Sequence, residues 1–371
     1  MKKEHDAVLE IVKFGGEKRD PARLLAVLDD AALNWIEILG YLCYHRVAGL
    51  AYETINAINV RKLDFPVFFA IYMIHQAQSM RTELQKQYVK SISSALRDAD
   101  IEHVFLKGAV LSSTIYPSGS RAFNDIDLLV SKRSLRPVRD LLYGLGFRQG
   151  KYDYKKNAVV EFQQDALTES IDTRGEMAPF VKIVNDKTLK TIDVDVNFSL
   201  DWRPAGTDEA VDHFLNERIL TPVDEECSIY SLREEHLFIQ LCSHFYKDAA
   251  LLDLVRKRKV LDLYKFVDIY TFVQDCFGGI DQTKLFDDSV KYGFDSHVFF
   301  TLNHAGTVFP DMMALPSVSA LYQKYEHVGA AVLTEVFDQY DSTIRMEATA
   351  GLLDRLFSYD IIKSYDSVGS S

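Results

Sequence analysis

The sequence predicts an α+β protein in which a mixed sheet with helices is flanked by N- and C-terminal helical regions. Two observations predict this class. In the first hundred residues, and again after Pro204, apolar residues recur at the spacing of amphipathic helices, as they do every four residues from Met80 to Leu96. From Ile101 to about residue 200, by contrast, strand-like segments interleave with helical ones.

We therefore expect four segments along the chain. Residues 1–100 form an N-terminal helical region, 101–204 an α/β core and 205–363 a C-terminal helical domain. In the C-terminal domain, one of the helical patterns covers Ser319–Phe337. The tail at 364–371 is polar and small, and we expect it to be disordered.

The order of elements in the core follows from its turn residues. A strand, IEHVFLKG, ends at Gly108, and the short helix after it is stopped by Pro117. The strand DIDLLV leads into a helix from Ser134 to Gly146, where serine suits the N-cap and glycine the stop. Another strand, AVVEFQQ, precedes a hairpin that turns at Asn185-Asp186 and ends in TIDVDVNF.

The composition of the chain bears on three properties: nucleic-acid binding, the cellular compartment and membrane insertion. The net charge of −12 argues against a protein that coats nucleic acid. None of the 4 cysteines forms a CxxC pair, so the sequence indicates neither a disulfide framework nor a zinc site and favours a reducing cytoplasm. The most apolar run, Phe65–Ile74, is too short to span a bilayer. We expect a cytoplasmic protein without a membrane partner.

Two pairs of aspartates stand in apolar strands. In DIDLLV, Asp125 and Asp127 share one strand face with Cα atoms roughly 7 Å apart. Such carboxylates repel unless a cation lies between them, and Mg²⁺ prefers oxygen ligands. Asp193 and Asp195 repeat the pattern. A single Asp-x-Asp is commonly a solvated face, but if the two strands are neighbours the carboxylates could hold two metal ions.

A basic segment precedes the first pair. Gly108, at the end of a strand and the start of a helix, lets a phosphate approach the backbone and the free N–H groups of the helix, and Lys107 adds positive charge. Arg121 could bind a triphosphate in a bidentate manner. The alternatives are a turn glycine and a salt bridge from Arg121 to Asp125 or Asp127.

Histidines at His236 and His244 lie two turns apart on a predicted helix, about 12 Å, which is too far for both to bind one zinc ion. His244 could contact the nucleotide or the acceptor. The alternative is a partly buried helix histidine with local partners.

The order LKG, IYP, SRAFNDIDLLV, LRPVRDLLYGLGF and IDVDVNF resembles the uncharacterised bacterial nucleotidyltransferase family of the polymerase β-like nucleotidyltransferase superfamily. The resemblance implies a polymerase β-like core in which Gly108 begins the phosphate-binding helix and Asp125 and Asp127 bind Mg²⁺. Asp195 matches the third carboxylate, with Asp193 as the fallback. The chain departs from the family at Asn197, where histidine is common, and in its long gap from Gly108 to Asp125.

The activity implied by the resemblance is transfer of an NMP group from an NTP, with ATP the expected donor, to a hydroxyl of a small-molecule, peptide or protein acceptor. Pyrophosphate is released, and two Mg²⁺ ions, or Mn²⁺ in their place, assist. The alternatives are a glycosyltransferase that holds a nucleotide-sugar through Asp-x-Asp and a non-catalytic nucleotide-binding protein on the same scaffold. A glycosyltransferase of that kind generally needs a Rossmann-like region before its motif, where this sequence looks helical.

Overall fold

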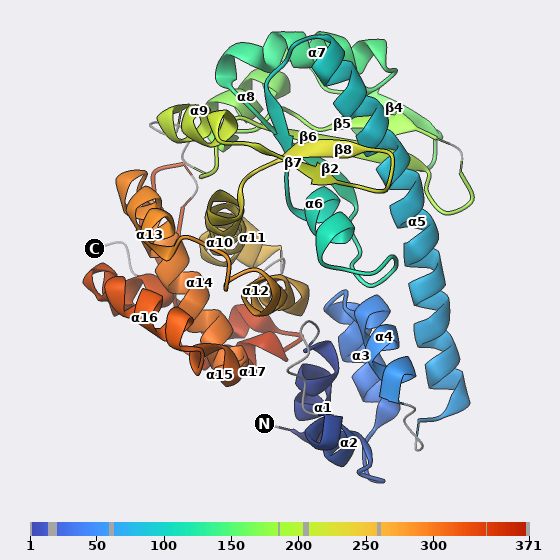
Figure 1. The fold of residues 1–371 in the computed structure, drawn as a ribbon, viewed down its shortest axis with the longest axis vertical. Coiled ribbons are helices and arrows are strands. Elements are labelled where there is room, and N and C mark those ends of the chain that lie inside the picture. Colours follow the sequence, from blue (N-terminus) through green and yellow to red (C-terminus); the bar gives the residue numbers. More distant parts are fainter. Residues whose placement is uncertain are drawn as a thin grey trace. The chain divides into compact units, whose positions relative to one another are not determined.

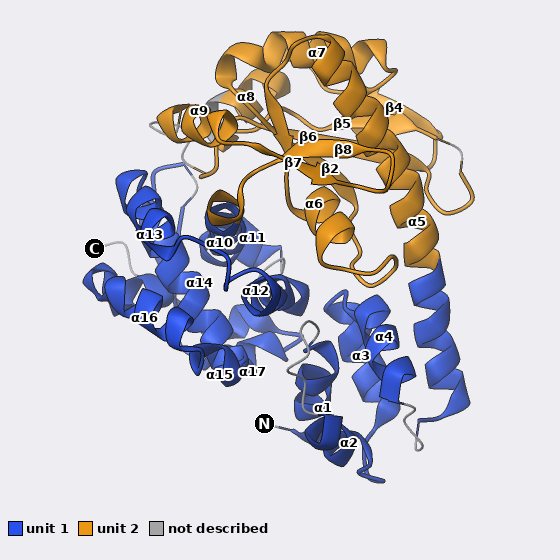
Figure 2. Ribbon diagram, viewed as in Figure 1, with its two compact units in different colours: residues 1–76, 238–371 blue, residues 77–237 orange. Residues whose placement is uncertain are grey.

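A computed structural model describes residues 2–13, 21–58, 63–184, 186–202, 208–257, 261–338 and 340–368. It divides into two compact units (Figure 2). Unit 1 comprises residues 1–76 and 238–371, and unit 2 comprises residues 77–237, which include the expected α/β core. The four expected segments stay predictions, and each unit is described by itself.

Unit 2 is built on a mixed sheet. Within the described residues its eight strands lie in the order β4-β3-β5-β6-β2-β1-β8-β7. Figure 1 labels several of these strands, among them β2 and β6. The pairs β2–β6 and β1–β8 are parallel and the other neighbours are antiparallel. The predicted fold class is confirmed. The strands are β1 (His103–Phe105), β2 (Asp125–Val130), β3 (Arg148–Asp153), β4 (Ala158–Glu161), β5 (Phe180–Ile183), β6 (Thr191–Asn197), β7 (Ile219–Pro222) and β8 (Ser228–Ser231).

Helices accompany this sheet; the two expected after Gly108 and after Ser134 are present, whereas the sequence predicted no helix between the strand AVVEFQQ and the hairpin, where the structure has one. Those of unit 2 are α6 (Lys107–Thr114), α7 (Leu135–Gly144), α8 (Gln164–Arg174) and α9 (Asp208–Asn216), preceded by the second half of α5 (Phe65–Asp98). A 3₁₀ turn, η1 (Lys132–Ser134), leads into α7. The predicted hairpin is present as β5 and β6, but Asn185 of its turn lies outside the described residues.

The core of unit 2 explains the alternating strand pattern. On β6, Ile192, Val194 and Val196 are buried while the residues between them are half-buried. On β2, Ile126 and Leu128 are fully buried. Burial of such side chains contributes about 1.5–3 kcal/mol each, which holds both strands in register and leaves their aspartates on the opposite face.

Unit 1 is helical and combines both ends of the chain. The ring of His5 stacks on Phe357 with centroids 4.0 Å apart, and the backbone N–H of Leu263 donates to Nδ1 of His45 over 3.3 Å. Its helices are α1 (Lys3–Val12), α2 (Pro21–Leu28), α3 (Trp35–Tyr44), α4 (Ala48–Ile58), the first part of α5, most of α10 (Glu234–Ala250), α11 (Leu252–Arg256), α12 (Leu263–Asp275), α13 (Gln282–Lys291), α14 (Asp295–Val308), α15 (Pro310–Met313), α16 (Pro316–Lys324) and α17 (Leu352–Leu356).

A small sheet in unit 1 corrects one expectation. The helix expected over Ser319–Phe337 ends at Lys324, and Gly329, with φ 81°, could not be part of a continuous α-helix to Phe337. Short 3₁₀ turns follow, η2 (Glu326–Val328) and η3 (Ala330–Leu333), and then β9 (Glu335–Phe337). This strand pairs with β10 (Ile344–Ala348), which pairs with β11 (Tyr365–Ser367) after η4 (Ile361–Ser364).

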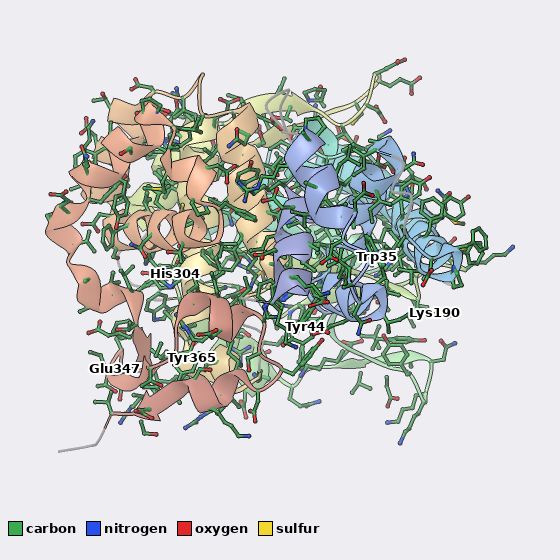
Figure 3. All side chains as sticks on the ribbon, turned by 90° about the horizontal axis from the view of Figure 1, so that it is seen from below. Trp35, Tyr44, Lys190, His304, Glu347 and Tyr365 are labelled. Atoms are coloured by element: carbon green, nitrogen blue, oxygen red, sulfur yellow. The ribbon has the colours of Figure 1, made fainter. Side chains whose placement is uncertain are left out.

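The end of the chain also differs in part from the expected disordered tail. Tyr365 of β11 and His304 of α14 are both buried within unit 1 (labelled in Figure 3). Residues 369–371 of that tail lie outside the described residues. Among the helices described, none combines the length and apolarity needed to cross a membrane.

Candidate active site

Four aspartates meet on two neighbouring strands. In the parallel pair β2–β6, Asp125 lies opposite Asp193 and Asp127 lies opposite Asp195 (Figure 1 for the strands). Side chains of residues i and i+2 share a strand face, and partners in register project to the same side. The two Asp-x-Asp pairs therefore form one group of carboxylates on a single face of the sheet.

The four aspartate side chains differ in their exposure to solvent. Asp125 is exposed at the start of β2, Asp127 is only 4% exposed, and Asp193 and Asp195 are half-buried. Carboxylates at this depth lose hydration without leaving water completely, so each charge costs more than at the surface. Such a position gains from a cation and stays accessible to one.

Burial and the mutual repulsion of the carboxylates raise pKa values in this group. Burial raises the pKa of Asp195 well above its usual range, and the charges of Asp127, Asp125 and Glu176 raise it further. Lys107 acts in the opposite direction. The pKa of Asp193 is also raised, by burial and by Asp125, and its Oδ1 has no hydrogen-bond partner among the described residues. A divalent cation would relieve both effects.

Lys107 is held against this group by the turn after β1. Its Nζ donates to Oδ1 of Asp127 over 2.8 Å, and both side chains are largely buried. The backbone N–H of Leu106 donates to the carbonyl oxygen of Asp127 over 3.0 Å. Lys107 itself has φ 42°, a left-handed conformation that costs a non-glycine residue about 1–2 kcal/mol. The turn thus maintains a strained backbone that points an ammonium group at β2.

Gly108 is required by the segment that leads into β2. A Cβ at this position would lie 2.4 Å from Cβ of Phe123 and 3.0 Å from Nη1 of Arg121. The absent side chain therefore makes room for residues 121–123 beside the first turn of α6. This is a steric reason that the sequence did not suggest, and it brings the buried Arg121 guanidinium beside the backbone of Gly108. Phosphate binding by either residue stays a prediction.

Asn197 continues the aspartate face of β6. Its Nδ2 donates to the carbonyl oxygen of Leu128 over 3.2 Å, so the side chain links β6 to β2. In the family that the sequence resembles, histidine is common here. The amide in this chain stabilises the strand pair that carries the carboxylates.

Glu176 is a fifth carboxylate that sequence reasoning missed. It forms a β-bridge with Asn197, and its charge raises the pKa of Asp195. The neighbouring Met177 N–H donates to the carbonyl oxygen of Val196 over 2.8 Å. The local sequence, a glycine and a glutamate after a helix, has no feature that predicts this pairing with a strand that begins fifteen residues later.

His244 is found with local partners. It belongs to unit 1, where its Nε2 lies 3.5 Å from Oδ2 of Asp248 one helical turn away. Asp248 also pairs with the buried Lys265. A contact of His244 with nucleotide or acceptor stays a prediction, whereas the other predicted site residues, Lys107, Gly108, Arg121, Asp125, Asp127 and Asp195, all belong to unit 2.

Comparison with known proteins adds one finding. A family model described as uncharacterised nucleotidyltransferase matches residues 31–310. No curated protein matches the chain.

Proposed function

The chain belongs to the family of uncharacterised nucleotidyltransferases, and from this premise we propose which group it transfers and with which residues. The proposed reaction moves an NMP group from an NTP, with ATP the expected donor, to a hydroxyl of a small-molecule, peptide or protein acceptor. The net charge of −12 supports an acceptor other than nucleic acid. The scarcity of cysteine motifs supports a cytoplasmic location.

One observation carries the proposal: the register that sets Asp125 opposite Asp193 and Asp127 opposite Asp195. Two Asp-x-Asp pairs on adjacent strands concentrate negative charge in a way that costs stability, as the raised pKa of Asp195 indicates. Carboxylates with strongly perturbed pKa values cluster at functional sites. The function that agrees with both these residues and the family is the binding of divalent cations for the transfer of a phosphorus-containing group.

The residues fit a divalent metal. Asp125, Asp127 and Asp195 offer the oxygen ligands that Mg²⁺ or Mn²⁺ prefers, with Asp193 as the fallback for the third. The partnerless Oδ1 of Asp193 among the described residues and the raised pKa of Asp195 both indicate a site short of positive charge. When bound, two such ions would neutralise the charge that develops on the phosphates.

The protein's own groups then bind and orient the reactants. Lys107, fixed by Asp127, and Arg121, beside Gly108, supply two cations near the first turn of α6, whose free N–H groups favour phosphate. Asp195 orients the acceptor hydroxyl and takes its proton. The acceptor oxygen bonds to the α-phosphorus, the bond from that phosphorus to the bridging oxygen breaks, and pyrophosphate leaves.

The reaction is tested with the purified chain, Mg²⁺, a cell extract as the source of acceptor and each NTP labelled at the α-phosphate. We expect label to enter an acceptor with pyrophosphate released in equal amount. Consumption of UDP-sugars but not of NTPs would replace the proposal with the glycosyltransferase alternative. Binding of NTP without turnover would favour the non-catalytic one.

The third carboxylate is tested by a matched pair of substitutions on β6. We expect Asp195→Asn to lower the transfer rate by about 10²-fold or more, because Asp195 contacts the reactants and faces Asp127. Asp193→Asn is expected to retain most activity. The reverse result would assign the third position to Asp193.

A further inference from the structure

Two histidines and a glutamate meet in unit 2, and none of the three is among the residues assigned to the proposed reaction. Glu217 follows the last residue of α9, His213 lies one turn before it, and His236 stands in the first turn of α10. One ligand atom from each residue can be chosen so that all three lie within 4.8 Å of one another. Among the described residues, these three therefore bring nitrogen and oxygen ligand atoms close enough together for one metal ion.

The spacing fits a shared ion better than direct contact. Nε2 of His213 lies 3.8 Å from Oε1 of Glu217, and Nε2 of His236 lies 3.9 Å from Oε2. Hydrogen bonds between such atoms are about 2.7–3.2 Å long, so these separations exceed them. Ligand atoms about 2.1 Å from a tetrahedral zinc ion lie about 3.4 Å apart, so the three ligand atoms, which lie within 4.8 Å of one another, would approach by up to about 1.4 Å to close the site.

The surroundings fix two of the three ligands. His236 is fully buried, and its ring stacks on Phe214 with centroids 3.8 Å apart. Arg233 donates to Oε2 of Glu217 over 3.2 Å and to Oε2 of Glu235 over 2.7 Å. Groups that hydrogen-bond a ligating carboxylate orient it, and this arrangement turns Oε1 of Glu217 toward His213.

We propose that His213, Glu217 and His236 bind a zinc ion, with water as the fourth ligand. Two imidazoles and a carboxylate form a borderline ligand set that suits Zn²⁺ over Mg²⁺, which prefers oxygen ligands alone. The ion connects the end of α9 to the start of α10 across the hairpin of β7 and β8 that lies between them in sequence. Its role is to stabilise this end of unit 2, independently of the proposed reaction.

The test uses the full chain carrying Asp127→Asn, so that the aspartate group contributes less to metal binding. Chelator-treated protein is titrated with Zn²⁺ and, separately, with Co²⁺. We expect about one Zn²⁺ per chain and a Co²⁺ spectrum with the intense visible bands of four-coordinate sites. Saturating Zn²⁺ should raise Tm by about 5–10 °C.

Three variants in that background identify the ligands. His213→Ala changes a half-exposed residue, and Glu217→Gln keeps size while removing charge; each should abolish the Co²⁺ bands and the Tm rise. Glu209→Gln, an exposed carboxylate on the same helix, should preserve both. Zinc binding and a Tm rise that persist in His213→Ala and Glu217→Gln would overturn the proposal, as would no Zn²⁺ binding by the parent. Neither result bears on nucleotidyl transfer.

Discussion

Lys107 and Gly108 show how two adjacent residues set up the proposed phosphate region for different reasons. The backbone of Lys107 has an unfavourable φ of 42°, and its side chain forms an ion pair with Asp127. Gly108 is needed because Phe123 and Arg121 occupy the space of a side chain. The sequence correctly directed attention to the Lys-Gly pair, but this steric requirement comes from residues thirteen and fifteen positions later.

Gly108→Ala should therefore lower stability, because the new Cβ would lie 2.4 Å from Cβ of Phe123. We expect a loss of about 1–3 kcal/mol in the free energy of unfolding, measured by urea denaturation. Gly144→Ala is the matched control: a Cβ there meets nothing within 4 Å, and the residue lies in α7. This change should be neutral or stabilise by up to about 1 kcal/mol. Equal effects of the two substitutions would contradict the steric argument.

At the scale of elements, the aspartate group depends on the pairing of β2 with β6. Alternation within each strand predicted that Asp125 shares a face with Asp127, and Asp193 with Asp195, since the apolar residues between them need burial. The sequence did not predict that β2 and β6 are neighbours in the sheet, because sixty residues and three strands separate them along the chain. Strand order arises from the packing of the whole sheet. For the same reason Glu176 and the cluster of His213, Glu217 and His236 could not be found from local patterns.

In unit 1, an ion pair between the buried Lys265 and the half-buried Asp248 joins α10 and α12. The charges of His244, Lys265 and Lys247 hold the pKa of Asp248 well below its usual range, although burial acts in the opposite direction. Lys265→Met should cost about 3 kcal/mol in the free energy of unfolding, because it leaves a half-buried carboxylate without the ammonium group that hydrogen-bonds it.

Adding Asp248→Leu to Lys265→Met should recover most of that loss, since it removes the uncompensated charge. The control is Lys257→Met, which removes an exposed ion pair with Asp253 on α11 and should change stability little. Urea denaturation of the three variants measures this. A double variant as unstable as the single one would show that packing, not charge, dominates at this position.

The stability of the whole molecule should depend on pH, because unit 1 contains buried histidines. Burial lowers the pKa of His45 to about 4 and that of His304 to about 3, the latter helped by Arg355. Nδ1 of His45 accepts a backbone hydrogen bond from Leu263, which protonation of that nitrogen would remove. Both residues are therefore neutral in the folded protein near pH 7.

Because these folded-state pKa values lie below the unfolded value of about 6.5, the unfolded chain binds more protons as pH falls. The contribution of these two neutral histidines to the free energy of unfolding is fully present above about pH 6.5 and is lost progressively below it. Between pH 7 and pH 5 we expect each histidine to contribute a loss of about 2 kcal/mol, measured by urea denaturation. His45→Gln should flatten this dependence, whereas the exposed His327→Gln should not. A stability independent of pH in this range would contradict the account.

The overall architecture was predictable, since helical and strand periodicities differ over long segments and the family resemblance added the core topology. The small sheet of β9 to β11 was not, because three short strands leave too little periodicity to distinguish them from helix ends. Nor did the sequence predict that the N- and C-terminal helical regions would form one unit. Contacts such as the stacking of His5 on Phe357 join residues at opposite ends of the chain.

The central claim is that the aspartates of β2 and β6 form the centre of a nucleotidyl-transfer site. Its most direct test is label transfer from α-phosphate-labelled NTP in the wild type, in Asp127→Asn and in Asp165→Asn, an exposed aspartate of α8. We predict that Asp127→Asn lowers transfer by at least about 10²–10³-fold while the wild type and Asp165→Asn remain active. Full activity of a folded Asp127→Asn protein would contradict the account.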